Sequence, residues 1–290
     1  MQGLILLNKP KGITSFSAVN KLKWLAQEKR VGHTGTLDPL ATGLLPVFFG
    51  RATSLAGLVL DADKSYIAEV KLGITTDTCD ITGAVLSEKT VSVTHEQLAE
   101  VLEHFKGKIM QVPPMYSALK VNGRCLYQLA REGETVERAP RAVTIKAIEA
   151  TDFDGTSFTL TCLVSKGTYI RVLAEDIGRA LGCGAHLTAL RRTRVGELTL
   201  ERAVTIEALD ACDDFEAARQ LLLGADALLS TLEAIHLDEM QMTRFMTGQR
   251  LALGLTMRGR VRVYGPNKML LGTAQVNDRG VLEPERLIAH

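Results

Sequence analysis

The chain has 290 residues, of which 46% are hydrophobic and 23% are charged, and its formal net charge is +1. This length suffices for one large core, or for a main domain with a small one attached. No run of about 18 apolar residues occurs, so we expect no transmembrane helix, and the start MQGLILLNKPKG lacks the basic and long apolar parts of a signal peptide.

The cysteines and histidines show no metal-binding or disulfide pattern. The five cysteines are scattered without a CxxC pair, and the six histidines have no HExxH or other ligand spacing. We therefore expect a cytoplasmic protein with reduced thiols and no structural metal.

The charges are unevenly distributed along the chain. Residues 1–50 carry a net charge of +4 and residues 241–290 a net charge of +5, whereas residues 201–240 carry −8. Two basic ends create local electric fields that the small total hides, and such fields suit a nucleic-acid partner. Chance clustering on a solvated surface explains the charges equally well.

The first half of the chain has the periodicity of strands and helices around one irregular loop. In order, we predict a strand at 3–7, a helix at 14–29, a loop at 30–53, a short helix at 54–63 and a strand at 64–73. Thr14 or Ser15 can cap the longer helix. Its predicted apolar face holds Phe16, Val19, Leu22 and Leu25. The second strand alternates, and one face should carry Tyr66, Ala68, Val70 and Leu72.

The second half mixes helices and strands in the same way. We predict a helix at 94–107, a long insertion at 111–141, strands at 141–153 and 157–165, a helix at 168–182 and a basic strand at 185–196. Thr94 and Gln97 have capping-box spacing, and Asp154 with Gly155 is a hairpin signal. The insertion combines a Pro-Pro break, a Val-Asn-Gly-Arg turn and many charges, which is typical of a mobile binding arm.

The tail changes character twice. Residues 201–240 are acidic with a helical pattern, and short alternating strands with Gly-rich turns follow from about residue 241. Arg258, Arg260 and Arg262 recur with a period of two and should share one strand face. Because no βαβ rhythm occurs, we predict an α+β protein: a mixed, mainly antiparallel sheet within residues 1–240, and a small β domain in residues 241–290.

The loop GHTGTLDPLATG around Asp38 excludes several chemistries. No Gly-Lys-Ser/Thr follows it, so it is not a phosphate-binding P-loop; the chain has no GxSxG elbow, and a glycosidase would need a second carboxylate. Glycines and prolines make the loop rigid enough to position one functional acid, although an Asp before Pro is also an ordinary turn former. These residues are Gly32, Gly35, Gly43, Pro39 and Pro46.

A second stretch, SKGTYIRVLAEDIG (165–178), joins a strand to a helix. Tyr169 and Arg171 fall in the first helical turn. An arginine there can pair with a carboxylate from elsewhere in the chain and keep it ionised. The alternative is that Arg171 is one of many surface arginines.

Four segments together resemble a known family. NKPKG, GHTGTLDPLATGLLP, KSYIAEVKLG and SKGTYIRVLAEDIG, in this order, are similar to the bacterial transfer-RNA pseudouridine synthases of the TruB family. The resemblance covers residue 3 to about 200, and the tail resembles the small PUA RNA-binding domain. It implies the pseudouridine synthase fold and conversion of uridine at position 55, in the TΨC loop, to pseudouridine. This reaction detaches uracil from C1′ and rejoins it through C5, without redox change or cofactor.

The resemblance also implies roles for the matching residues. Asp38 is the essential carboxylate, acting as a nucleophile at the sugar or base, or as the base that removes a sugar proton. His33 occupies the space that the flipped uridine leaves and stacks on neighbouring bases. Arg171 pairs with Asp38. Contacts to the target nucleotide are expected from Tyr66, Tyr169, Leu190 and Asp80.

Basic residues are expected to support the loop and to bind RNA. Lys9 would support the Asp38 loop, and Lys166 would lie near the RNA. The insertion would close over the RNA, with phosphate contacts from Lys120, Arg124, Arg131, Arg138 and Arg141.

Three functions stay open at this point. The first is a synthase for transfer RNA; the second is a synthase for another RNA, such as ribosomal RNA or a guide-dependent target. The third is an RNA-folding module that opens and refolds the transfer-RNA elbow without chemistry. We expect a monomer with no obligatory protein partner and no membrane association, because no heptad run stands out.

Overall fold

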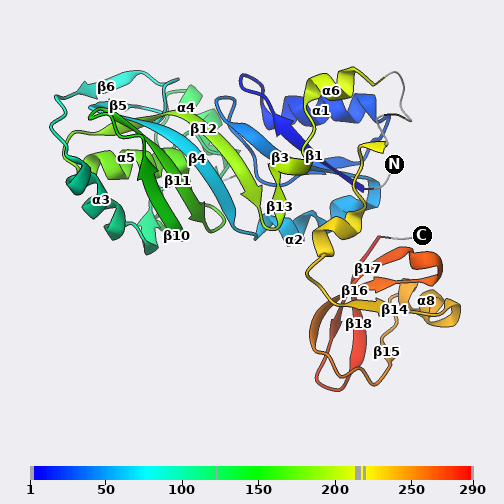
Figure 1. Cartoon of the computed structure of the whole chain (residues 1–290). Coiled ribbons are helices and arrows are strands. Elements are labelled where there is room, and N and C mark those ends of the chain that lie inside the picture. Colours follow the sequence, from blue (N-terminus) through cyan, green and yellow to red (C-terminus); the bar gives the residue numbers. More distant parts are fainter. Residues whose placement is uncertain (1–2, 122, 213–216, 218–219, 289–290) are drawn as a thin grey trace.

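The computed structural model describes residues 3–121, 123–212, 217 and 220–288 (Figure 1). Asn122 of the predicted Val-Asn-Gly-Arg turn and part of the acidic segment therefore lie outside the described residues. No helix within these ranges is long and apolar enough to span a membrane.

Within the described residues, a nine-stranded sheet organises the larger part of the molecule. Its main path runs through β1 (Gly3–Lys9), β3 (Thr42–Phe49), β12 (Ala185–Val195), β4 (Lys64–Leu72), β11 (Ser157–Val164), β10 (Arg141–Thr151) and β7 (Gly107–Gln111). Two short strands, β2 (Val31–His33) and β13 (Leu198–Thr199), pair with β3 and β12. Only β3 and β12 pair in parallel among these, so the predicted mainly antiparallel sheet is confirmed.

Apolar residues pack on one face along most of this sheet, and on the opposite face mainly at its β1–β3 end. On β4 the alternation buries Tyr66, Ala68, Val70 and Leu72, as predicted. This face packs against four helices, namely α1 (Ser15–Leu25), α3 (His95–His104), α5 (Ile170–Ala180) and α6 (Ile206–Asp210). The opposite face packs against short helices, namely η1 (Gly50–Leu55), α2 (Ala56–Leu60) and η3 (Ala225–Leu229). Between β4 and α3 the chain forms a hairpin of β5 (Ile74–Thr76) and β6 (Val85–Glu88).

The predicted helix caps are confirmed, whereas the predicted apolar face of α1 is only partly correct. The capping box of Thr94 and Gln97 is confirmed at the start of α3, and Thr14 caps α1. The apolar face of α1 was partly wrong: Val19 and Leu22 are buried, but Phe16 is 71% exposed. The buried stripe of α1 continues instead through Ser15 and Ala18, while the side chain of Leu25 is not described.

The segment predicted as an irregular loop, 30–53, is mostly regular structure. It forms β2 and β3, and the loop itself covers only residues 34–41. The prediction failed because β3 reads TGLLPVFF, a continuous apolar run. Such a run is expected for a strand with both faces buried, and its glycine and proline resemble turn signals.

Gly43 lies where β3 meets β12, and its φ is 98°. A Cβ atom there would overlap the backbone carbonyl of Arg192 on β12. We expect Gly43→Ala to lower the free energy of unfolding by about 1–2 kcal/mol through backbone strain and by about 1–3 kcal/mol more through the clash.

Gly155→Ala is the matched control, because Gly155 has a φ of 92° and its Cβ would meet nothing within 4 Å. Urea unfolding of both variants separates the strain from the clash. Equal losses of stability would contradict the close approach of β3 and β12.

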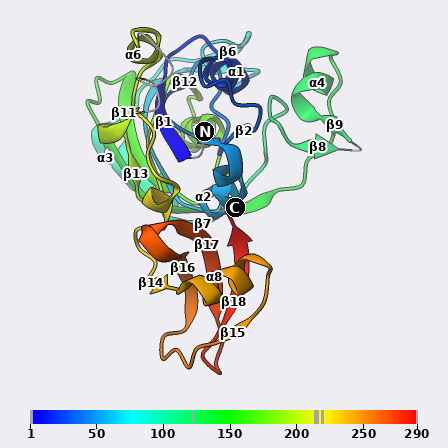
Figure 2. The ribbon, with the colours of Figure 1, turned by 90° about the vertical axis from the view of Figure 1, so that its right-hand side faces the viewer.

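The insertion leaves the sheet after β7 and returns at β10, its neighbour. It contains a small hairpin of β8 (Lys120–Val121) and β9 (Arg124–Cys125), followed by α4 (Leu126–Arg131). Figure 2 shows this arm standing beside the main body. The described part of the insertion thus contains one short helix, α4.

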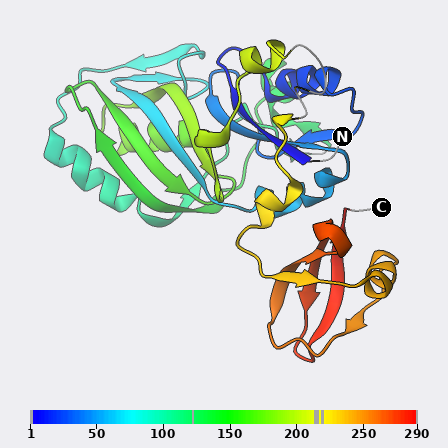
Figure 3. The same cartoon turned by 45° about the vertical axis from the view of Figure 1, so that its right-hand side comes forward.

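A second, five-stranded sheet forms the C-terminal part (Figure 3). It consists of β14 (Ala234–His236), β16 (Gly259–Tyr264), β17 (Leu270–Val276), β18 (Val281–Leu287) and β15 (Leu251–Ala252), with α8 (Glu239–Met246) beside it. It has its own apolar core, which includes Val261, Val263 and Leu271. Because β14 pairs with β16, this sheet begins before the expected boundary at 240/241.

Within its described residues, the acidic segment 201–240 combines short helices with extended stretches. Its described elements are α6, η3, part of η2 (Leu200–Arg202), β14 and the start of α8. Two stretches between them run along the edge strand β1, where Leu4 N–H donates to Leu223 O at 2.9 Å and Asn8 N–H donates to Val204 O at 2.8 Å. These two stretches therefore cover the edge of β1. Backbone groups that pair with β1 are not available for a helix.

Candidate active site

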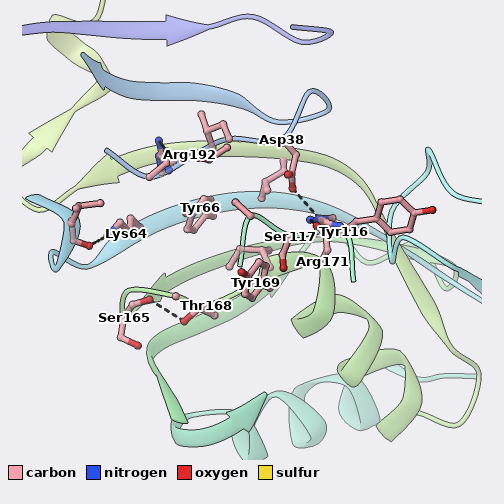
Figure 4. Close-up of a pocket in the computed structure, with 18 residues that line it drawn as sticks. Asp38, Lys64, Tyr66, Tyr116, Ser117, Ser165, Thr168, Tyr169, Arg171 and Arg192 are labelled. Atoms are coloured by element: carbon pink, nitrogen blue, oxygen red, sulfur yellow. Dashed lines mark hydrogen bonds and ion pairs between the residues drawn. The ribbon is translucent and has the colours of Figure 1, made fainter. Parts of the chain in front are cut away.

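A cavity of about 280 Å³ lies between the Asp38 loop and the N-terminal end of α5 (Figure 4). This volume is near the lower end for small-molecule sites. Five residues that sequence analysis singled out line it: Asp38, Tyr66, Tyr169, Leu190 and Arg171. They come from the 34–41 loop, β4, the N-cap of α5, β12 and the first turn of α5.

Three clamps hold the Asp38 loop in place. The buried Ser15 hydroxyl accepts a hydrogen bond from Leu37 N–H at 2.8 Å and donates to Leu37 O at 3.0 Å. Gly12 N–H donates to Pro39 O at 2.8 Å. The fully buried Arg192 donates to Gly35 O at 2.8 Å. The residues on both sides of Asp38 are therefore fixed from outside the loop.

Removing the Ser15 clamp should misplace Asp38. If the activity is the one that the resemblance implies, we expect Ser15→Ala to lower kcat by about tenfold or more, because small displacements of a reacting group are costly, with affinity for the implied RNA substrate changed less than threefold. Ser17→Ala on the exposed side of α1 is the control. Single-turnover kinetics at saturating RNA measures the effect, and equal rates for the two variants would show that the loop holds itself in place.

Arg171 pairs with Asp38, as the family resemblance implied. Its Nε lies 2.9 Å from Asp38 Oδ2, and its Nη1 and Nη2 donate to the carbonyl oxygens of Thr78 and Tyr116 at 3.0 and 2.8 Å. The arginine side chain is 6% exposed, whereas that of Asp38 is 42% exposed. Both side chains line the cavity, but the carboxylate is the more accessible of the two and its cationic partner is almost fully buried.

Asp80 approaches the same Arg171 nitrogen as Asp38 but is not among the residues that line the cavity. Its Oδ2 is 3.7 Å from Arg171 Nε, and its Oδ1 accepts hydrogen bonds from Thr78 Oγ1 and Thr82 N–H, each at 2.9 Å. This geometry suits a role in positioning Arg171, and the base contact that we expected for Asp80 stays a prediction.

Tyr66 and Leu190 form neighbouring parts of the cavity wall. Both are almost fully buried, and they lie on the adjacent strands β4 and β12. Tyr169 N–H donates to Gln111 Oε1 at 2.8 Å, and Gln111 Nε2 donates back to Tyr169 O at 3.1 Å. Burial raises the pKa of the Tyr169 phenol, so this side chain stays neutral at physiological pH.

His33 lies on β2 and is not one of the residues that line the cavity. Its ring is half-buried, and Nδ1 has no hydrogen-bond partner among the described residues. Burial, assisted by the nearby Arg192 cation, lowers the pKa of the ring. A neutral imidazole without a proton-transfer partner suits stacking better than acid–base chemistry.

The expected basic residues differ in their surroundings. Lys9 is fully buried and donates to Pro10 O and Ile13 O, both at 2.8 Å, so it braces the turn that clamps Pro39. Burial lowers the pKa of Lys9 to about 8, although the nearby Asp38 opposes the shift. Lys166 pairs with Asp61 at 2.7 Å on the surface.

The insertion cations and the C-terminal arginines are mostly engaged within the protein. Arg124 pairs with Glu132, and Arg131 lies 5.8 Å over the Tyr127 ring. Arg138 Nη1 donates to Pro113 O at 3.2 Å. In the tail, Arg260 pairs with Glu285 and Arg258 donates to several loop carbonyls. Lys120 and Arg141 are exposed.

Sequence analysis missed several residues that line the cavity: Lys64, Tyr116, Ser117, Ser165, Thr168 and Arg192. Lys64 lies two residues before Tyr66 on the same face of β4, so alternation alone identifies it. Burial lowers the pKa of Lys64 to about 8. Tyr116 and Ser117 had no such signal, because a long insertion does not reveal which of its residues return to the site.

Three family models match consecutive parts of the chain. The model of the N-terminal domain of TruB family pseudouridylate synthases matches residues 23–170. Those of the tRNA pseudouridylate synthase B C-terminal domain and of the pseudouridine synthase II TruB C-terminal domain match residues 171–230 and 234–288. The chain belongs to the TruB family. It is thus an isomerase that forms pseudouridine.

Curated relatives of this TruB family member match it over nearly its whole length. The tRNA pseudouridine synthase B of Cupriavidus metallidurans is 51% identical, over 99% of this chain and 94% of the relative. The proteins of the same name from Ralstonia nicotianae and Dechloromonas aromatica are 54% and 50% identical, over 99% of this chain and 94% and 96% of theirs.

Solved structures confirm the fold of this TruB family member. A chain of an H/ACA RNP bound to a substrate RNA containing 2′-deoxyuridine superposes with a TM-score of 0.76 at 24% identity, over 99% of this chain and 85% of that one. A chain of a Cbf5-Nop10-Gar1 complex superposes with a TM-score of 0.74 at 25% identity, over the same shares. The expected pseudouridine synthase fold is confirmed.

Proposed function

We propose that this enzyme isomerises the uridine at position 55, in the TΨC loop of transfer RNA, to pseudouridine. The observation that carries the proposal is the Asp38–Arg171 pair at 2.9 Å on the wall of a nucleoside-sized cavity. The names of relatives that are 50–54% identical supply the substrate class. The T-loop position rests on the four motifs that resemble the family.

The chemistry needs one well-placed carboxylate. The C1′–N1 bond breaks, uracil turns, and a C1′–C5 bond forms while C5 loses a proton and N1 gains one. Asp38 acts either as the nucleophile or as the base that takes a sugar proton. Because its carboxylate is 42% exposed and faces the cavity, both routes fit the geometry.

The size of the cavity requires the target nucleotide to leave the RNA stack. Unstacking costs a few kcal/mol, and the exposed part of the RNA loop must be held open. We propose that the uracil base packs against Tyr66 and Leu190 and that Tyr169 contacts the same nucleotide, because all three residues line the cavity. His33, outside the cavity, would stack on the bases that remain in the RNA.

The insertion and the basic ends would bind the RNA backbone. Lys120 is exposed and has no ion pair among the described residues, whereas Arg124 already pairs with Glu132 and Glu134. We expect Lys120→Ala to weaken transfer-RNA affinity more than Arg124→Ala, and to reduce the slope of log affinity against log salt by about one. Filter binding from 50 to 300 mM salt tests this, and a larger loss for Arg124→Ala would refute it.

Release of tritium from C5 tests the function itself. A transfer-RNA transcript that carries [5-³H]uridine loses label to water when C5 becomes bonded to C1′. We expect release by the purified protein alone, about one equivalent per transcript, and none from a transcript with cytidine at position 55. Release from ribosomal RNA only, or only with a guide RNA, would favour the second function; binding and refolding without release would favour the third.

We further assign the enzyme to the cytoplasm, where transfer RNA is processed, and expect it to act as a monomer. The C-terminal sheet would serve as a PUA-like module on the acceptor-stem side. Sedimentation at micromolar concentration, with and without transfer RNA, distinguishes a monomer from a dimer.

A further inference from the structure

Ser117 is a buried polar residue of the cavity wall that the proposed mechanism has not used. It is 6% exposed and lines the cavity together with Asp38 and Tyr169. Its Oγ makes no hydrogen bond of good geometry within the described part of the chain; the Tyr169 phenol is nearby but does not satisfy it. Since buried hydroxyls are almost always hydrogen-bonded, an unpartnered hydroxyl on the wall of a ligand site points to a bond that the ligand completes.

The protein fixes the backbone around Ser117. The preceding residue, Tyr116, accepts a hydrogen bond at 2.8 Å from the same guanidinium that holds Asp38. Ser117 N–H donates to Met115 O at 2.8 Å, and Ser117 O accepts from Tyr127 N–H of α4 at 3.0 Å. The backbone that carries Ser117 is thus anchored to Arg171, through Tyr116, and to α4 of the insertion.

This position places Ser117 at the sugar end of the site. Figure 4 shows it between Arg171 and Tyr169, near Asp38. In two of the routes open to Asp38, its carboxylate reaches C1′ or a hydrogen of the sugar, so the ribose must lie beside it. Tyr66 and Leu190, which we assigned to uracil, lie on the strands of the sheet.

We propose that the Ser117 hydroxyl hydrogen-bonds the 2′-hydroxyl of the target nucleotide and so makes the site selective for ribose over deoxyribose. A 2′-hydroxyl both donates and accepts, as does serine, so either direction completes the unpaired group. The inference rests on the proposed function, because it needs a flipped uridine in the cavity. The Tyr169 phenol lies near enough to the Ser117 hydroxyl for the serine to oppose the rise in the phenol pKa that burial causes, so the phenol and the 2′-hydroxyl can share the serine hydroxyl.

A substrate–enzyme double-mutant cycle tests the contact. Single-turnover kcat/KM is measured for wild type, Ser117→Ala and Ser117→Thr on transfer-RNA T-arm hairpins with uridine or 2′-deoxyuridine at the target position. We expect Ser117→Ala to lose about tenfold on the uridine hairpin and nothing further on the deoxyuridine hairpin. Ser117→Thr, which keeps a hydroxyl, should recover most of the rate. Ser87→Ala, in the β5–β6 hairpin away from the cavity, is the control.

Each outcome decides the proposal. An equal loss on both hairpins would overturn it, because the hydroxyl would then act on the base or on the fold. An unchanged kcat/KM of Ser117→Ala on both hairpins would also overturn the proposal. If the deoxyuridine hairpin reacts too slowly, the same cycle is measured as Kd in the Asp38→Asn background. Thermal unfolding checks that Ser117→Ala is folded. Failure of the wild-type enzyme on the uridine hairpin would refute the proposed function instead.

Discussion

Asp38→Asn is expected to reduce pseudouridine formation by about 10³-fold or more while transfer-RNA binding persists within a few-fold. General acid–base or nucleophilic participation by one side chain is commonly worth this much. Asparagine has the same shape, and the clamps on Leu37, Pro39 and Gly35 do not involve the Asp38 side chain. The loop should therefore keep its position, so the loss reflects chemistry and not misfolding.

Asp210→Asn is the matched control for this prediction. The Asp210 side chain is 47% exposed, similar to the 42% of Asp38, and it pairs with Lys21 on the surface. Tritium release should be unchanged in this variant, and filter binding should give the same affinity for both. Near wild-type turnover by Asp38→Asn would mean that another group performs the chemistry.

Arg171→Met is expected to lower turnover by about 10²-fold with RNA affinity unchanged within about threefold. All three guanidinium nitrogens have protein partners, and the side chain is 6% exposed, so it is not placed to bind a phosphate. Its loss removes the cation that fixes the Asp38 carboxylate. A loss of affinity with unchanged turnover would instead identify Arg171 as an RNA contact.

The same variant should be less stable, because it leaves Asp80 buried without its cation. Breaking a buried ion pair costs about 3–5 kcal/mol. Adding Asp80→Asn to Arg171→Met should recover much of this stability, as measured by urea unfolding, without restoring turnover. Recovery of both would show that Arg171 acts only through the fold.

Local sequence signals located the chemistry but not its surroundings. The turn residues around Asp38 identified a rigid loop, and the position of Arg171 in the first turn of α5 placed it at the cavity. The clamps could not be predicted, because Ser15 and Arg192 reach the loop from α1 and β12 through tertiary packing. The parallel pairing of β3 with β12, which brings Gly43 against Arg192, likewise joins segments about 150 residues apart.

Burial was the property that the sequence predicted least well. The base contact expected of Asp80 stays a prediction: its Oδ2 lies 3.7 Å from Arg171 Nε, and Asp80 is not among the residues that line the cavity. Phe16 fitted an apolar repeat but lies outside the buried stripe of α1. No sequence pattern placed Ser117 at the cavity, because its position depends on how the insertion folds back to Arg171.

Mapping the modified position in a transfer-RNA transcript tests the central claim most directly. A uridine-containing transcript is incubated with the purified protein, treated with carbodiimide and mild alkali, and copied by reverse transcriptase, which stops next to modified pseudouridine. We expect one enzyme-dependent stop, corresponding to position 55, that the Asp38→Asn protein does not produce. A stop elsewhere, or no stop with wild-type protein that binds the transcript, would contradict the proposed function.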